Sequence, residues 1–149
     1  MTAKEYLSKI QIYRRAIMST QLRIEELEHQ ASGIRAITYD RDRVQVSLEN
    51  RMEDIMVRIA TQAEKMGKQI IRYQREVAKR EKQIAGMDNP DYAEILRLRY
   101  IELDEGGRPM SLEEIACEMH LSFYRVAHLH GEALETFKRK YLMPKDSKH

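Results

Sequence analysis

The sequence predicts an all-α protein, in which a long antiparallel, coiled-coil-like helical hairpin precedes a C-terminal three-helix domain with a helix-turn-helix. Three observations lead to this class. Charged residues make up 34% of the 149 residues, with only 6 Gly and 3 Pro, which suits long solvated helices. Two long segments repeat apolar residues at alternating steps of four and three, as helices with one buried face do. Two shorter helical segments near the C-terminus are separated by a tight turn.

The first predicted helix covers residues 2–30. Its apolar seam is formed by Tyr6, Ile10, Tyr13, Ile17, Thr20, Ile24, Leu27 and Ala31. Ser32-Gly33 is expected to end this helix, because glycine is the usual residue just past a helix end. Residues 32–48, which include Arg43-Val44-Gln45, are interpreted as a connector.

The second predicted helix covers residues 49–85 and ends at Gly86. Its seam is formed by Met52, Met56, Ile59, Ala63, Met66, Ile70, Tyr73, Val77, Arg80 and Ile84. Two seams of similar length joined by one connector predict a hairpin domain over residues 1–87. We expect this domain to form a homodimer or to bind a partner such as RNA polymerase.

The C-terminal domain is predicted over residues 88–143, and residues 144–149 are expected to be a disordered tail. Asn89-Pro90 favours the start of a helix over residues 91–102. Ser111 and Glu114 have the spacing of a capping box, which predicts a helix over residues 112–119. His120-Leu121-Ser122 is then a tight turn with Leu121 buried at its centre. Ser122 caps the next helix, whose inner face carries Val126, Leu129, Ala133, Leu134 and Phe137.

The sequence lacks the residue patterns expected of an enzyme, a cofactor-binding protein or a metalloprotein. Adjacent carboxylates diverge on a helix, and no phosphate-binding loop or nucleophile motif is present, so no catalytic residue and no cofactor is expected. The spacing of His120, His128 and His130 does not suit a metal site. Cys117 cannot form an intramolecular disulfide and is interpreted as a semi-buried structural residue. No signal peptide or membrane span is expected, which indicates a cytoplasmic protein, without membrane contact, in a bacterial host cell.

The outward face of the second motif helix is the candidate site for double-stranded DNA. Arg and His side chains can donate to guanine, and aromatic rings can contact a thymine methyl group. Because the formal net charge is only +2, DNA binding requires a local basic surface, of which Lys138 to Lys140, Lys145 and Lys148 are the clearest part. The candidate DNA-binding residues are Ser122, Phe123, Tyr124, Arg125, Ala127, His128, Gly131 and Lys138.

A family resemblance rests on the order of several short segments. They are the stretches 95–100 (ILRLRY) and 112–116 (LEEIA), the pair Leu121-Ser122, Val126, and 132–134 (EAL). Together they resemble the promoter-reading C-terminal domain of bacterial sigma factors. They are more similar still to the RinA- and ArpU-type transcriptional regulators of phages of Gram-positive bacteria. The sigma pattern usually has basic or polar residues along the second helix, whereas this chain has the apolar Phe123 and the small Ala127 and Gly131. The loop before Ser111 is also longer than in sigma factors.

The resemblance implies a phage or prophage transcriptional regulator that binds duplex DNA through its helix-turn-helix. Two alternatives stay open. One is a DNA-packaging adaptor of the small terminase type, although there the DNA-binding part is expected first. The other is a protein-interaction module that acts on RNA polymerase without reading DNA.

Overall fold

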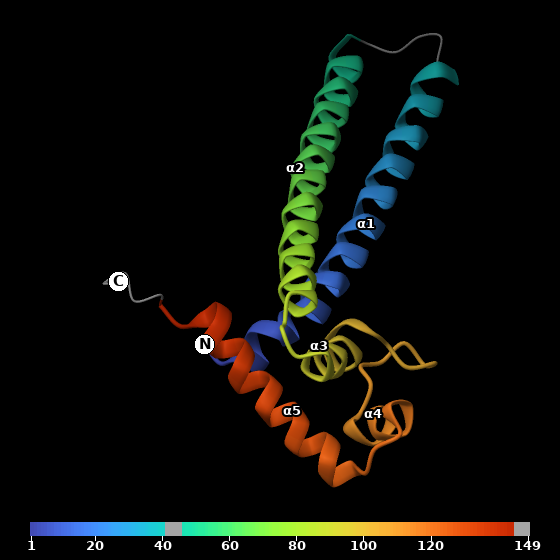
Figure 1. The fold of residues 1–149 in the computed structure, drawn as a ribbon. Helices are drawn as coiled ribbons and strands as arrows, with labels where there is room; N and C mark the ends of the chain where they lie inside the picture. Colours follow the sequence, from blue (N-terminus) through green and yellow to red (C-terminus); the bar gives the residue numbers. More distant parts are fainter. Residues whose placement is uncertain (41–45, 145–149) are drawn as a thin grey trace. The chain divides into compact units, whose positions relative to one another are not determined.

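The computed structural model describes residues 1–40 and 46–144, and in this part of the chain it confirms the all-α class (Figure 1). Helices α1 (Ala3–Asp40) and α2 (Val46–Ala85) are long, and α3 (Pro90–Leu96), α4 (Leu112–Met119) and α5 (Phe123–Phe137) are short. The π-helical turns η1 (Arg97–Ile101) and η2 (Lys138–Leu142) extend α3 and α5. An isolated backbone bridge pairs Leu103 with Pro109 in the loop before α4.

The predicted end of the first helix at Ser32-Gly33 is wrong, because α1 continues to Asp40. A glycine ends a helix when it adopts the left-handed conformation. Gly33 does not have a positive φ, and nothing lies within 4 Å of the position where a Cβ would be. It is therefore an ordinary helical residue, at a cost of about 1 kcal/mol relative to alanine. The connector element Arg43-Val44-Gln45 lies outside the described residues.

The chain forms two compact units. One combines Met1–Tyr13 with the chain from Arg75 onward, and the other is Arg14–Gln74. The sequence places a single boundary at residue 87. The structure places the start of α1 and the end of α2 with the C-terminal elements instead, because Leu7, Ile10 and Ile84 belong to the same buried cluster as the residues of α3 to α5.

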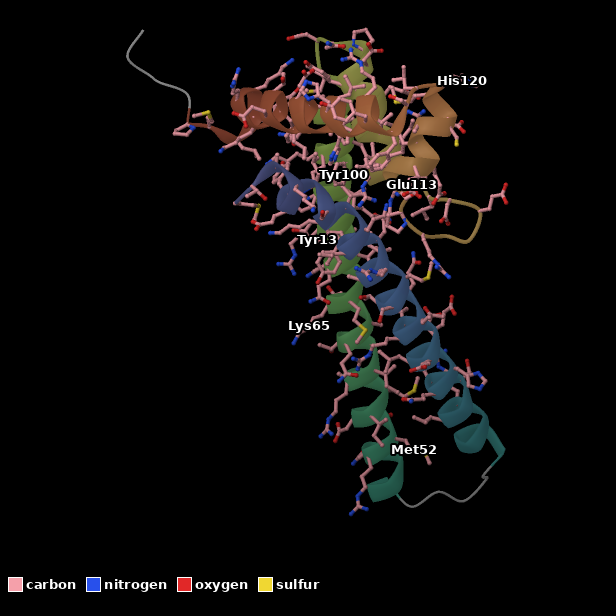
Figure 2. The ribbon with its side chains drawn as sticks, turned by 90° about the horizontal axis from the view of Figure 1, so that it is seen from below. Tyr13, Met52, Lys65, Tyr100, Glu113 and His120 are labelled. Carbon is pink, nitrogen blue, oxygen red and sulfur yellow. The ribbon has the colours of Figure 1, made fainter. Side chains whose placement is uncertain are left out.

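The unit Arg14–Gln74, called the arm below, is an antiparallel pair formed by segments of α1 and α2 (Figures 1 and 2). The described seam residues of the arm are half-buried or buried, which confirms the three-four pattern, and among them Ala31 and Ile59 are buried. A groove of about 460 Å³ lies between the two helices, lined in part by Leu27, Ile34 and Ile55. Two helices alone leave much apolar surface in water. Among the described residues of the arm, the large exposed apolar side chains are Met18, Leu22, Ile55, Val57 and Ile71.

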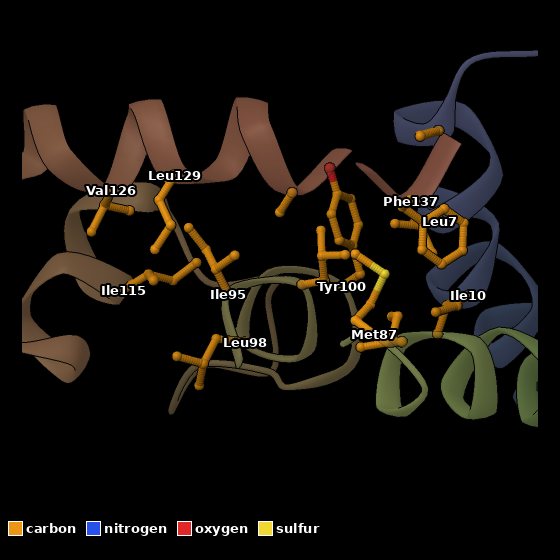
Figure 3. Packing of buried hydrophobic residues seen from close by; sticks show 14 of the residues in the cluster. Leu7, Ile10, Met87, Ile95, Leu98, Tyr100, Ile115, Val126, Leu129 and Phe137 are labelled. Atoms are coloured by element: carbon orange, nitrogen blue, oxygen red, sulfur yellow. The ribbon is translucent and has the colours of Figure 1, made fainter. Parts of the chain in front are cut away.

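The other unit has one hydrophobic core (Figure 3). α3 and η1 contribute Ile95, Leu96, Leu98 and Tyr100, α4 contributes Ile115, and α5 contributes Val126, Leu129, Ala133 and Phe137. Phe137 is fully buried, and its ring centroid lies 5.9 Å from that of Tyr6 and 4.9 Å from that of Tyr141. Ends of long helices therefore help to hold α5 in place.

Arg80, predicted as a seam position, is buried and is only 3% exposed. Its Nε donates to the carbonyl oxygen of Tyr6 at 2.9 Å, and its Nη1 donates to a carboxylate oxygen of Glu76 at 2.8 Å. The guanidinium lies 4.1 Å from the ring centroid of Tyr6 and 5.2 Å from that of Tyr13. A charge at this depth is tolerated because hydrogen bonds and aromatic faces surround it.

None of the helices in the described ranges has a stretch that is long and apolar enough to cross a bilayer. The predicted tail begins at Pro144, and its remaining residues lie outside the described part of the chain.

Candidate nucleic-acid interface

α4 begins at the predicted capping box. The backbone N–H of Glu114 donates to Ser111 Oγ at 3.1 Å, and the Glu114 carboxylate accepts from the Ser111 backbone N–H at 3.5 Å. Ile115 and Ala116 are buried and Leu112 and Met119 are half-buried, so these four residues form the inward face of α4. The Glu113 and Glu118 side chains are exposed on the opposite face of this helix.

The turn after α4 depends on His120, which adopts the left-handed conformation with φ 57°. Its backbone N–H donates to the carbonyl of Cys117, and the N–H of Leu121 donates to that of Ala116 at 3.0 Å. These two bonds form a Schellman motif, which glycine usually closes. The predicted burial of Leu121 is wrong, since this side chain is 39% exposed. The two backbone hydrogen bonds close the turn, so a buried apolar side chain is not needed to stabilise it.

Four exposed candidate residues, Ser122 to Arg125, lie together at the start of α5. The N–H of Arg125 donates to Ser122 Oγ at 3.1 Å, which confirms the predicted cap. Phe123 is 52% exposed and Tyr124 is 83% exposed, and Arg125 is exposed beside them. Val126 is fully buried against the core. The first turn of α5 is thus fixed on one side and presents two aromatic rings and a guanidinium on the other.

The remaining candidate residues are less well placed. Ala127 is half-buried and Gly131 is exposed without a side chain. The Nε2 of His128 lies 2.8 Å from a carboxylate oxygen of Glu132. Lys138 is exposed but begins η2, about 20 Å along the helix axis from Tyr124. The structure therefore brings Ser122 to Arg125 together and leaves Lys138 apart from them.

The partner of His128 belongs to a network that the sequence analysis did not find. The other carboxylate oxygen of Glu132 accepts a hydrogen bond from Tyr92 Oη at 3.0 Å. This bond raises the pKa of the Tyr92 hydroxyl. The spacing of four residues between His128 and Glu132 is a usable signal, but the contact with α3 requires the tertiary fold.

His130 is half-buried behind the exposed face. Its Nε2 lies 2.9 Å from Tyr100 Oη. Burial, together with the charges of Arg99 and Lys4, lowers the pKa of His130 to about 4. Burial also raises the pKa of Tyr100 to about 12. Both groups are neutral at pH 7 and join α5 to η1.

Cys117 is exposed, so the expectation of a semi-buried residue is wrong. It lines a cleft of about 620 Å³ beside η1 and the loop before α4. Within the described ranges, no three His, Cys, Asp or Glu side chains gather as ligands for a metal ion. The acidic lining of the cleft comes from Glu102, Asp104, Glu105, Glu114 and Glu118.

The charge of the C-terminal part is acidic rather than basic. Residues 88–143 contain eleven Asp and Glu against seven Lys and Arg. Arg97 is held by Glu94 and Glu102, and Lys140 lies near Asp88. The Arg125 guanidinium makes no hydrogen bond or ion pair with any residue that the structure describes. It is therefore the cation best placed to meet a phosphate or a base beside the aromatic pair.

Residues 34–135 match the family described as "Protein of unknown function (DUF1492)". The chain belongs to the DUF1492 family. Comparisons with curated proteins and with solved structures gave no match. The family match includes all of α2 to α4 and most of α5, so the elements that build the candidate interface lie within the DUF1492 region.

Proposed function

We propose that this DUF1492 protein is a phage or prophage transcriptional regulator that binds duplex DNA through α4 and α5. The observation that carries the proposal is the first turn of α5, where Phe123, Tyr124 and Arg125 are exposed and Val126 is buried. In a helix-turn-helix, the residues at the start of the second helix enter the major groove. The similarity to RinA- and ArpU-type regulators supports the regulatory role.

The apolar surface of the arm supports a dimer. One helix-turn-helix reads a short sequence, and a second copy at a fixed spacing adds affinity and specificity. Exposed side chains such as Leu22 and Val57 are available for a contact between two arms. Solution mass separates a dimer from the larger ring expected of a small terminase.

The test of DNA reading is selection of bound sequences from a random duplex pool. We expect enrichment of one short motif by the full chain. The double variant Arg125→Ala and His128→Ala loses that enrichment and keeps its helical circular dichroism. Arg108→Ala is the matched control, because it removes an exposed cation from the loop before α4. Equal enrichment by the double variant and the control contradicts the assignment of α5.

A second candidate function is a protein-interaction module that acts on RNA polymerase. The excess of acidic residues in the C-terminal part favours it, because negative charge opposes the approach of DNA. This candidate predicts no enrichment from the random pool and binding of a purified polymerase, with the Glu113 and Glu118 side chains at the contact.

A further inference from the structure

Helix α2 carries a row of six cations that the sequence analysis did not identify. We name it the basic stripe and define it as Lys65, Lys68, Arg72, Arg75, Lys79 and Lys82. The steps between neighbours are three, four, three, four and three residues, so the row follows one face of the helix. All six side chains are exposed. The signal was present in the sequence as a second three-four pattern, formed by charges instead of apolar residues.

The basic stripe lies on the side of α2 away from its seam. With about 100° between successive residues, the stripe is centred about 150° from the seam residues Met66, Tyr73 and Val77. Figure 2 shows Lys65 on the side of α2 that faces away from α1. The stripe is therefore a solvent face of one continuous helix, Val46–Ala85.

The charge of the basic stripe is almost uncompensated. Residues 65–82 contain seven Lys and Arg and only two acidic residues. Glu76 is held by Arg80, which lowers the pKa of its carboxyl. Among the described residues, only Lys68 of the six stripe cations has an ion pair, an exposed one of 3.4 Å with Glu64. Like charges at these spacings destabilise a helix, so a polyanion that neutralised them would relieve the repulsion.

The shape of the basic stripe favours duplex DNA as its partner. Seventeen helical steps extend it over about 26 Å. A duplex presents one phosphate charge for about every 1.7 Å of its axis, so it offers negative charge at close intervals along a row of cations on one helix. Gln62 and Gln69 line a shallow groove with Lys65, Lys68 and Arg72, and their amides can donate to phosphate oxygens.

The acidic C-terminal part of a second copy matches the stripe less well. Of its acidic loop and α4 residues, Glu102 is paired with Arg97, and Glu114 caps α4. Asp104 accepts from backbone N–H groups of its own turn. Too few unengaged carboxylates remain for a row of six cations.

We propose that the basic stripe of α2 binds the phosphate backbone of duplex DNA without reading its sequence. The inference rests on the proposed function for its partner but assigns a separate site. α5 supplies sequence preference, and the basic stripe supplies affinity that the acidic C-terminal part lacks.

The test replaces all six stripe cations with Gln, which is a good helix former, in the full chain. Binding of a fluorescent duplex of random sequence is measured over a salt series. Neutralising six phosphate contacts makes the slope of log K against log salt less negative by about 5, so the affinity ratio of unaltered protein to variant should rise about 30-fold each time the salt concentration is halved. The half variant, Lys65→Gln with Lys68→Gln and Arg72→Gln, loses about half of that slope. Circular dichroism checks the helix content of both variants.

The matched control replaces six exposed cations elsewhere with Gln, at Lys4, Arg15, Arg23, Arg51, Arg58 and Arg108. Equal losses in the stripe variant and the control overturn the proposal, and so does the absence of salt-dependent DNA binding by the unaltered protein. Equal loss of binding to duplex RNA overturns the assignment to DNA. The Arg125 and His128 double variant tests the proposed function separately. It should lose the selected motif but keep the slope of log K against log salt that the basic stripe supplies.

Discussion

Replacement of Arg80 by Ala tests how the start of α1 and the end of α2 are joined. The change removes the charged hydrogen bond to the Tyr6 carbonyl, about 1.5 kcal/mol, and the contact with the Tyr6 ring, about 1 kcal/mol. Loss of the packed aliphatic stem adds about 1 kcal/mol. The bond to Glu76 adds little, because that carboxylate is 40% exposed and water replaces the arginine. The free energy of unfolding should fall by about 3–4 kcal/mol.

Urea unfolding followed by circular dichroism at 222 nm measures this loss. Glu76→Gln is the matched control, which should cost less than about 1 kcal/mol. Arg80→Met keeps the stem packing and should fall between the two. If Arg80→Ala costs no more than Glu76→Gln, the hydrogen bond to Tyr6 and the ring contact do not stabilise the fold, and the reasoning is refuted.

Three further predictions concern the C-terminal elements. As pH falls from 6.5 to about 4, the free energy of unfolding of the wild type should fall, because the unfolded state binds a proton at His130 that the folded state excludes. His130→Gln should remove this dependence on pH. The difference between wild type and variant, at most about 3 kcal/mol, is measured by urea unfolding over that range, and parallel curves would contradict it. His120→Gly should raise the free energy of unfolding by about 1 kcal/mol, because glycine adopts φ 57° without strain; a lower melting temperature would show that the side chain stabilises the turn. Ser122→Ala should cost about 1 kcal/mol by removing the cap of α5, and an unchanged melting temperature would be inconsistent with that cap.

Local signals predicted the secondary structure well. The capping residues Ser111 and Ser122 fixed the starts of α4 and α5, because a side-chain cap is a contact between near neighbours. Gly33 misled the prediction of α1, because a glycine ends a helix only where its neighbours favour the left-handed conformation. The same reasoning did not identify His120 as the residue that adopts it.

These local signals could not predict contacts between residues that are far apart in the sequence. The spacing placed Arg80 in an apolar seam. The contacts that allow its charge to be buried come from the carbonyl and ring of Tyr6 in another helix, which the spacing does not predict. The predicted boundary at residue 87 was placed at the loop between α2 and α3. The hydrophobic core extends across this boundary, because it includes Leu7 and Ile84 as well as Phe137. The basic stripe, in contrast, is a local pattern of charges along one helix, and its spacing alone predicts it.

Site-directed photocrosslinking in the full chain tests the central claim most directly. A benzophenone amino acid replaces Tyr124 at the start of α5, and in a separate protein it replaces Glu105 in the loop before α4; both residues are exposed. With a selected duplex, position 124 should crosslink to bases within the motif, and position 105 should give no DNA adduct. Adducts at position 105 with none at position 124 would contradict the reading of DNA by α5.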